Sequence, residues 1–220
     1  MARILILNPP FMDDFVRSAR WAARSRGRVQ RHPDYLLITT AVLEAAGHEL
    51  RFIDGAALNL KPADIREAAD TFRPDMAVLH TTTPSIYNDI NLARLIKERT
   101  GAFTVLVGNH VSAEPDDSLR IAAEAVDRIV RGEYDFVLRD LAARPDDLSI
   151  AGISFTGDGG VVHNPLPPPL DVDELPFPAW RHVRPEWYRD AGKLYPFLTL
   201  LSGRGCFARC TFCQDRKSVV

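Results

Sequence analysis

The sequence of 220 residues has only three cysteines, almost no net charge and no long apolar run. No run approaches the roughly 20 apolar residues that cross a bilayer, so no membrane span is predicted. A formal net charge of −2 gives no general attraction to nucleic acid, and no nucleic-acid partner is expected. The segment Met1–Leu7 is too short for a signal peptide and has no small-residue cleavage site. With an odd number of cysteines, these absences predict a cytoplasmic protein without a disulfide framework.

Two nucleotide-binding motifs are also missing. No Gly-x-Gly-x-x-Gly follows the first apolar run, which excludes the dinucleotide fingerprint. No Gly-x4-Gly-Lys-Ser/Thr is present, which excludes a P-loop NTPase. The first part of the chain is therefore expected to bind a different kind of ligand.

Short apolar runs alternate with helical patterns over the first 150 residues. Five runs have the continuous apolar character of parallel strands covered on both faces; they are Ile4–Leu7, Leu50–Ile53, Ala77–Leu79, Thr104–Val107 and Arg128–Val130. Between them lie helical patterns at Tyr35–Ala46, from Pro62, from Thr83-Pro84, and at Asp116–Val126. This alternation predicts an α/β fold with a right-handed, doubly wound parallel sheet.

Ligands of such sheets bind beyond the carboxyl ends of the strands, where the strand order reverses. The candidate residues all follow a predicted strand: Asn8, Pro9 and Pro10; Thr81, Thr82, Thr83 and Ser85; Gly108, Asn109 and His110; and Gly132 and Glu133. Their glycines and hydroxyls let the backbone approach a large polar ligand closely. Two simpler interpretations stay open, helix capping for Thr81–Ser85 and a backbone-bonded loop histidine for His110.

The first connection is rich in arginine. Six arginines and no acid occupy fifteen residues: Arg17, Arg20, Arg24, Arg26, Arg28 and Arg31. A solvated, flexible loop is the favoured interpretation. The alternative is a lid whose guanidinium groups bind phosphate or carboxylate on a ligand.

Proline divides the chain after Val161. The runs Asn164–Pro169 and Leu175–Pro178 favour extended backbone and cannot continue a helix. We predict a first domain over residues 1–145, then a strand and a proline-rich surface linker over residues 146–196. Residues 197–220 would begin a second domain, with Phe197–Leu201 as its first strand.

The three cysteines, Cys206, Cys210 and Cys213, lie within eight residues in the spacing Cys-x3-Cys-x2-Cys. Thiolates bind zinc or iron–sulfur clusters. Structural zinc takes four ligands, and a candidate fourth, His182, is 24 residues upstream beyond the proline-rich stretch. A zinc-binding interaction protein is therefore the less favoured alternative. Three thiolates would leave one iron of a [4Fe–4S] cluster open to a substrate or cofactor.

The segment Ser202–Cys213, with Cys-x3-Cys-x-aromatic-Cys after an apolar run, resembles the radical S-adenosylmethionine (SAM) superfamily. The resemblance implies that Cys206, Cys210 and Cys213 hold a [4Fe–4S] cluster whose fourth iron binds SAM. It also implies electron transfer that cleaves SAM to a 5′-deoxyadenosyl radical, an electron donor such as flavodoxin or ferredoxin, and a small-molecule substrate.

A doubly wound domain followed by Glu174–Trp180 and the cysteines is similar to the cobalamin (B12)-binding subgroup of that superfamily. The landmarks occur in the expected order: Asn8-Pro9-Pro10, Gly47-His48, Gly108-Asn109-His110 and Gly132-Glu133. The resemblance implies a Rossmann-like or flavodoxin-like B12-binding domain whose strand-end residues contact cobalamin. The chain lacks Asp-x-His-x-x-Gly around His110, so no histidine ligand to cobalt is expected there, and Gly-Asn replaces the usual Gly-Gly at position 108.

We therefore expect the N-terminal portion of a cobalamin-dependent radical SAM enzyme that catalyses methyl transfer or, second, oxidative ring formation. Phe197–Leu201 would start a (β/α) barrel, which takes about 250 residues when complete. The chain is thus expected to be a fragment or to be completed by a partner, and an orphan barrel strand is expected to pair poorly. The alternative is a catalytically inactive cobalamin-binding module.

Overall fold

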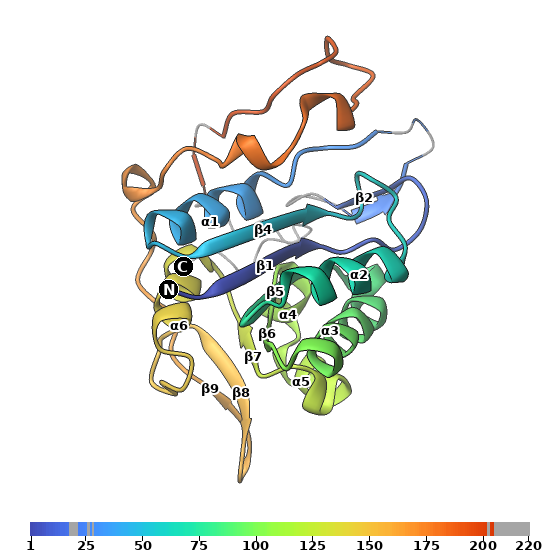
Figure 1. The fold of residues 1–220 in the computed structure, drawn as a ribbon. Coiled ribbons are helices and arrows are strands. Elements are labelled where there is room, and N and C mark those ends of the chain that lie inside the picture. The colour runs from blue at the N-terminus through green and yellow to red at the C-terminus, as the bar shows by residue number, and fades with distance from the viewer. Residues whose placement is uncertain (18–21, 26, 28, 202, 205–220) are drawn as a thin grey trace.

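A seven-stranded sheet forms the centre of the computed structural model, which describes residues 1–17, 22–25, 27, 29–201 and 203–204 (Figure 1). Its strands, in spatial order, are β4 (Glu49–Asp54), β1 (Arg3–Asn8), β5 (Met76–His80), β6 (Phe103–Val107), β7 (Arg128–Val130), β8 (Ile153–Gly157) and β9 (Gly160–His163). The first five are parallel, and β8 and β9 extend the sheet antiparallel. The parallel part has the flavodoxin-like order, as predicted, and its order reverses between β1 and β5.

Helices cover both faces of the sheet. They are α1 (Asp34–Ala45), α2 (Pro62–Phe72), α3 (Ile86–Thr100), α4 (Asn109–Ala113), α5 (Pro115–Ala122) and α6 (Asp135–Ala143). The helix predicted over Asp116–Val126 ends early, because Ala123 has a φ of 47° and begins a single 3-10 turn, Ala123–Ala125. Within the part of the chain that the structure describes, no helix has the length and apolarity to cross a membrane.

Two apolar cores explain why the strands read as continuous apolar runs. On β1, Leu5 and Leu7 pack in the core with α2, α3 and α5, whereas Ile4 and Ile6 pack in the core with α1 and α6. All four side chains have no exposed surface. Successive residues of a strand point to opposite faces, so burial on both faces removes the polar alternation of a half-exposed strand.

The proline-rich linker is more firmly packed than predicted. It contains three short 3-10 turns, Val172–Glu174, Trp180–His182 and Pro185–Trp187, and it runs across α1 (Figure 1). Phe177 is exposed, as expected of a surface linker, but Tyr188 is completely buried. The Ala179 N–H donates to the Leu37 carbonyl at 3.0 Å. The linker therefore closes the core over α1, and a purely superficial connector was a wrong prediction.

The segment Phe197–Leu201 forms no strand, which corrects the prediction of a first barrel strand. Among the described residues no strand pairs with it. Side chains hold it instead: the Thr199 hydroxyl donates to Asp34, and the Phe197 ring meets the His32 ring at 5.1 Å. The predicted cluster ligands Cys206, Cys210 and Cys213 lie outside the described residues.

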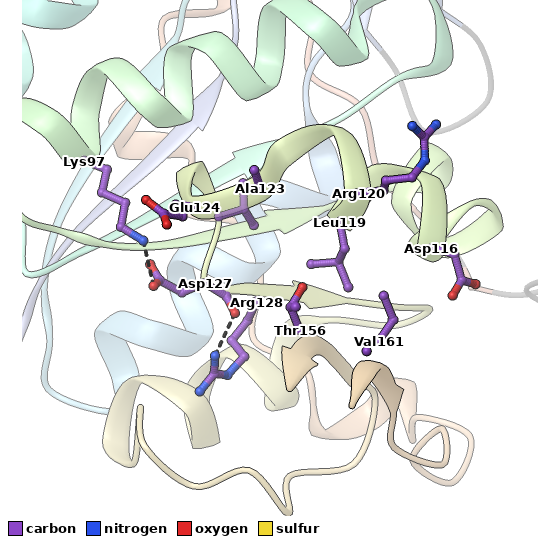
Figure 2. Close-up of a pocket in the computed structure, with 12 residues that line it drawn as sticks. Lys97, Asp116, Leu119, Arg120, Ala123, Glu124, Asp127, Arg128, Thr156 and Val161 are labelled. Carbon is purple, nitrogen blue, oxygen red and sulfur yellow. Dashed lines mark hydrogen bonds and ion pairs between the residues drawn. The ribbon is translucent and has the colours of Figure 1, made fainter. Parts of the chain in front are cut away.

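A hollow of about 710 Å³ opens at the amino end of β7, between α5 and the β8–β9 hairpin (Figure 2). Its charged lining includes Lys97, which binds Asp127 at 2.7 Å, and Arg128 at the start of β7. Because ligands of doubly wound sheets bind at the opposite, carboxyl edge, this hollow is not the predicted site.

Candidate functional site

The structure brings most of the predicted residues together at the carboxyl edge of β1, β5 and β6. Asn8, Pro9, Pro10, Thr81, Thr82, Ser85, Gly108 and His110 are buried there, whereas Thr83 and Asn109 are exposed. Gly132 and Glu133 lie farther along the edge, at the end of β7, and are partly buried. The main group therefore surrounds the β1–β5 reversal, where a doubly wound sheet binds its ligand.

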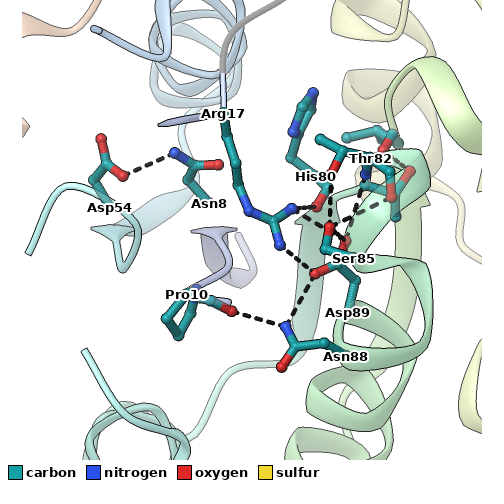
Figure 3. A network of polar contacts seen from close by, with 11 residues as sticks. Asn8, Pro10, Arg17, Asp54, His80, Thr82, Ser85, Asn88 and Asp89 are labelled. Carbon is teal, nitrogen blue, oxygen red and sulfur yellow. Dashed lines mark hydrogen bonds and ion pairs between the residues drawn. The ribbon is translucent and has the colours of Figure 1, made fainter. Parts of the chain in front are cut away.

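Arg17 reaches this edge from a small hairpin, β2 (Phe15–Arg17) and β3 (Ala22–Arg24), that sequence analysis interpreted as a loop. Its guanidinium donates to Asp89 Oδ1 at 2.5 Å, to Asp89 Oδ2 at 3.1 Å and to the His80 carbonyl at 3.2 Å (Figure 3). Neither side chain has any exposed surface. For Arg17 the prediction of a solvated loop is wrong, because a buried protein carboxylate binds its charge. Arg20, Arg26 and Arg28 lie outside the described residues.

The hydroxyl groups after β5 extend the Arg17 network. The Ser85 hydroxyl donates to Asp89 Oδ2 at 2.7 Å and lies 2.6 Å from the Thr82 hydroxyl. Asn88 Nδ2 donates to the Pro10 carbonyl at 2.7 Å, which ties α3 to the segment after β1 (Figure 3). No side chain caps the 3-10 turn Thr83–Ser85 or α3. Helix capping is therefore not what Thr82 and Ser85 do, and their hydroxyls hold the edge in one arrangement.

A buried carboxyl, Asp54, organises the other side of β1. Its Oδ1 accepts from Asn8 Nδ2 at 2.8 Å and from the Ala57 N–H at 3.1 Å, and its Oδ2 accepts from the Tyr188 hydroxyl at 2.9 Å. Burial raises the pKa of Asp54, and the hydrogen bonds to Ala57, Tyr188 and Asn8 oppose that rise. The hydrogen bond from Asn8 Nδ2 to Asp54 fixes the orientation of the Asn8 amide, so that its oxygen, Oδ1, points away from Asp54.

Besides Arg17 Nε, the buried polar atoms at this edge without a hydrogen-bond partner include Asn8 Oδ1, His80 Nδ1 and His110 Nε2. They belong to the ends of β1 and β5 and to the start of α4 after β6. The other His110 ring nitrogen lies 3.2 Å from the Thr83 hydroxyl, so the contact is to a side chain and not to backbone. Burial, assisted by the Arg17 charge, lowers the pKa of His80 to about 3. An unpaired buried polar group costs about 1–3 kcal/mol, so these atoms fit a ligand with hydrogen-bonding groups of its own.

Gly108 lets the backbone pass close to β5. Its φ of 112° and ψ of −178° are open essentially to glycine alone. A Cβ at this position would lie 2.7 Å from the Thr81 carbonyl oxygen and 3.0 Å from His80 Cδ2. The side chain that other residues carry would therefore push against the end of β5.

Replacing Gly108 by alanine is expected to destabilise the protein by at least about 1 kcal/mol more than replacing Gly101 by alanine. Gly101 is the matched control, because it also has a positive φ, 74°, but a Cβ there would meet nothing within 4 Å. Urea unfolding of both variants measures the difference. Equal midpoints would show that the close approach at Gly108 costs nothing.

Sequence analysis missed four residues that fix this edge, Asp54, His80, Asp89 and Tyr188, and it named Arg17 only as part of the arginine-rich connection. His80 was within reach, because extending the predicted strand Ala77–Leu79 by one residue places it at the carboxyl end. Asp89 stands four residues after Ser85, a spacing that puts both on one helical face. Arg17 and Tyr188 gave no such signal, since their partners are 72 and 134 residues away in sequence.

Among the described residues, no group of three histidine, cysteine, aspartate or glutamate side chains is arranged to hold a metal ion. The predicted cluster cysteines lie outside the described residues and are not part of this finding.

The chain is similar to several known proteins. The family model for the B12 binding domain matches residues 30–142. An uncharacterized methyltransferase from Pyrococcus horikoshii is 32% identical over 178 residues, which cover 76% of this chain and 37% of that protein. The anaerobic magnesium-protoporphyrin IX monomethyl ester cyclase of Rubrivivax gelatinosus is 28% identical over 203 residues, or 84% of this chain and 35% of the relative.

The fold is shared with a solved structure. OxsB, described as a cobalamin-dependent S-adenosylmethionine radical enzyme with aqua-cobalamin and S-adenosylmethionine bound, matches with a TM-score of 0.76 and 19% identity. The match covers 97% of this chain and 28% of OxsB. The chain thus spans little more than a third of the two curated relatives and less than a third of OxsB.

Proposed function

The chain belongs to the B12-binding domain family and is related to cobalamin-dependent radical SAM enzymes, and on this premise we propose that its sheet edge binds cobalamin. The residues would be those at the ends of β1, β5 and β6: Asn8, Pro9, Pro10, Thr81, Thr82, Thr83, Ser85, Gly108, Asn109 and His110. The observation that carries the proposal is the set of three unpartnered polar atoms on Asn8, His80 and His110 inside the matched fold.

The donor set fits a corrinoid. Cobalamin carries carboxamide groups around its ring, and these groups both donate and accept hydrogen bonds. Asn8 Oδ1 accepts, and the unpartnered ring nitrogens of the two histidines, His80 Nδ1 and His110 Nε2, donate or accept according to the tautomer. The close approach at Gly108 keeps the segment after β6 against the end of β5, which would hold this side of the ligand site in place. Protein groups of this kind would bind and orient the cofactor and exclude water from it.

The wider proposal is a radical SAM enzyme that catalyses methyl transfer or, as the second candidate, oxidative ring formation. Cys206, Cys210 and Cys213 would hold a [4Fe–4S] cluster, which supplies an electron to SAM when both are bound. A small-molecule substrate and a flavodoxin or ferredoxin as electron donor are the proposed partners. The chain's relation to a methyltransferase and to a cyclase supports both reaction types.

Hydroxocobalamin titration tests the binding proposal. The protein is expected to change the absorption spectrum of the corrinoid saturably, and Gly108→Ala is expected to weaken that binding at least tenfold. Gly101→Ala serves as the control, because it strains the backbone at the end of α3 and is expected to bind like the wild type. Wild-type protein that binds no hydroxocobalamin would refute the assignment of the edge.

Metal analysis separates the enzyme from the alternatives. When all three cysteines are intact, the anaerobically reconstituted protein is expected to contain iron and sulfide in a ratio near 1:1. The reduced protein is also expected to cleave SAM. Cobalamin binding without SAM cleavage would favour a catalytically inactive carrier module. One zinc and no iron would favour an interaction protein.

A further inference from the structure

Arg204 joins the segment that leads to the cysteines to the first domain. Its guanidinium donates from Nη1 to Asp135 Oδ2 at 2.7 Å and forms an ion pair from Nη2 with Glu133. The guanidinium carbon also lies 4.3 Å from the centre of the Tyr35 ring. Only 5% of the Arg204 side chain is exposed. The side chain is therefore inserted into the first domain and does not lie on its surface.

The site that receives Arg204 is built from four side chains, Tyr35, Thr39, Glu133 and Asp135, which we call the Arg204 receptor. Asp135 has no exposed surface, and its Oδ1 accepts from the Thr39 hydroxyl at 2.5 Å. Tyr35 and Thr39 belong to α1, and Asp135 begins α6. Two carboxylates and an aromatic face in one pocket match a planar cation, and a buried carboxylate without a cation is strongly unfavourable.

Two further contacts place the same segment against the start of α1. The Thr199 hydroxyl donates to Asp34, and Phe197 packs edge-on against His32. The receptor and these contacts all lie at the amino ends of α1 and α6, which follow the carboxyl edge of the sheet. The described residues 197–201 and 203–204 are therefore held beside the proposed cobalamin edge through side chains.

We propose that Arg204 is a positioning residue that fixes the cysteine-bearing segment to the carboxyl edge of the B12-binding domain. Arg204 stands two residues before Cys206, and consecutive Cα atoms are about 3.8 Å apart. An anchored Arg204 thus restrains how far the first cysteine can be from α1 and α6. The inference rests on the proposed function, because the role of this anchor would be to keep the distance between the cluster and the corrinoid constant.

Fixed separation matters because two reactive centres must meet a common substrate. A displacement of about 1 Å in such an arrangement can cost a hundredfold in rate. Arginine suits the task better than lysine, since its planar fork reaches two carboxylates at once and stacks on an aromatic ring. The Glu133 carboxylate, expected from sequence to line the cobalamin site, is engaged by Arg204 in this arrangement.

The first test uses the chain without cofactors. Arg204→Met is expected to raise the rate of chymotrypsin cleavage within Phe197–Leu201 about tenfold, because a hydrogen-bonded ion pair that contributes about 1.4 kcal/mol or more is lost. Arg204→Lys is expected to show a smaller increase. Arg181→Met is the matched control, since Arg181 belongs to the same linker, is largely exposed and forms an ion pair with Glu44 of α1. An unchanged cleavage rate in Arg204→Met would overturn the anchor.

The second test reads position directly. In protein reconstituted with iron, sulfide and cobalamin, pulsed EPR measures the distance between the reduced cluster and cob(II)alamin. A single narrow distribution is expected for the wild type, and a broader or longer one for Arg204→Met at equal iron and corrinoid content. Glu133→Gln, which retains the buried Asp135 contact, covers the case in which Arg204→Met folds poorly, and a smaller broadening is expected.

The outcomes separate this inference from the proposed function. Wild-type protein that takes up no iron or no cobalamin refutes the proposed function, and the cleavage experiment then decides the anchor by itself. Full occupancy of both cofactors with an identical distance distribution in Arg204→Met refutes the positioning role. A changed distribution that Arg204→Lys partly restores supports it.

Discussion

Replacing Arg17 by methionine is expected to lower the free energy of unfolding by about 3–5 kcal/mol, because it leaves the carboxylate of Asp89 buried without its cation. Both side chains are completely buried, and Arg17 also donates to the His80 carbonyl. Methionine has a similar volume, so the loss reports mainly the charge and its hydrogen bonds. Such a loss is a large part of the 5–15 kcal/mol that stabilises a typical domain.

Urea unfolding of four proteins tests this prediction: the wild type, Arg17→Met, Asp89→Leu and the double variant. The double variant is expected to lose less than the sum of the two single losses, because neither charge then remains unpaired. Arg99→Met removes an exposed partner of Asp70 and is expected to unfold close to the wild type. A loss in Arg17→Met no larger than that of Arg99→Met would contradict the buried pair.

Acidification from pH 7 to pH 5 is expected to remove about 2 kcal/mol of stability through His80 alone. The pKa of His80 is lowered to about 3 by burial and by the Arg17 charge, whereas the unfolded chain has an ordinary histidine pKa of 6.5. A lowered pKa in the folded state means that the unfolded state takes up the proton first. The contribution is therefore fully present above pH 6.5 and is lost as the pH falls toward 3.

His32 adds a loss in the same direction. It lies between Tyr188, Trp180 and Phe197, with ring centres 3.9–5.3 Å apart, and burial lowers its pKa to about 4. Asp54 works in the opposite sense, because burial raises its pKa and its contribution is lost as the pH rises. The contribution of a single histidine to the pH dependence of the unfolding free energy must therefore be isolated by substitution.

Urea unfolding at several pH values between 7 and 5 compares the wild type with His80→Gln. The variant is expected to lose stability less steeply on acidification, and the difference between the two slopes gives the His80 contribution. His163→Gln, at an exposed position on β9, is the control. Parallel curves for the wild type and His80→Gln would show that His80 is free to take up a proton in the folded protein.

The parallel sheet could be predicted from sequence because burial on both faces leaves an unmistakable apolar run. All five predicted parallel strands are present, and the resemblance to cobalamin-binding radical SAM proteins is confirmed by the family and its relatives. The position of Asn8, Thr81 and Gly108 at the carboxyl edge could also be predicted, since each residue ends or follows a parallel strand.

The contacts across the edge could not be predicted, because they join residues far apart in sequence. Arg17 begins an arginine-rich stretch that itself contains no acid, and the Asp89 carboxylate that neutralises Arg17 comes from α3, 72 residues away in sequence. Tyr188 lies among prolines that indicate an extended linker, yet its ring fills the core beside α1. Hydrophobic periodicity reports which face of an element is buried, not which distant group will meet it.

The hydrogen bond from the Tyr188 hydroxyl to Asp54 also limits how far the chain can be shortened. A version shortened to residue 145 would end at a natural-looking boundary, just beyond α6. It would lack Val183 and Tyr188, which pack in the same apolar core as α1, and the Asp54 carboxyl would lose one of its hydrogen-bond donors. The smallest unit expected to keep the proposed corrinoid edge intact therefore runs through Tyr188, 46 residues past the end of the family match at residue 142.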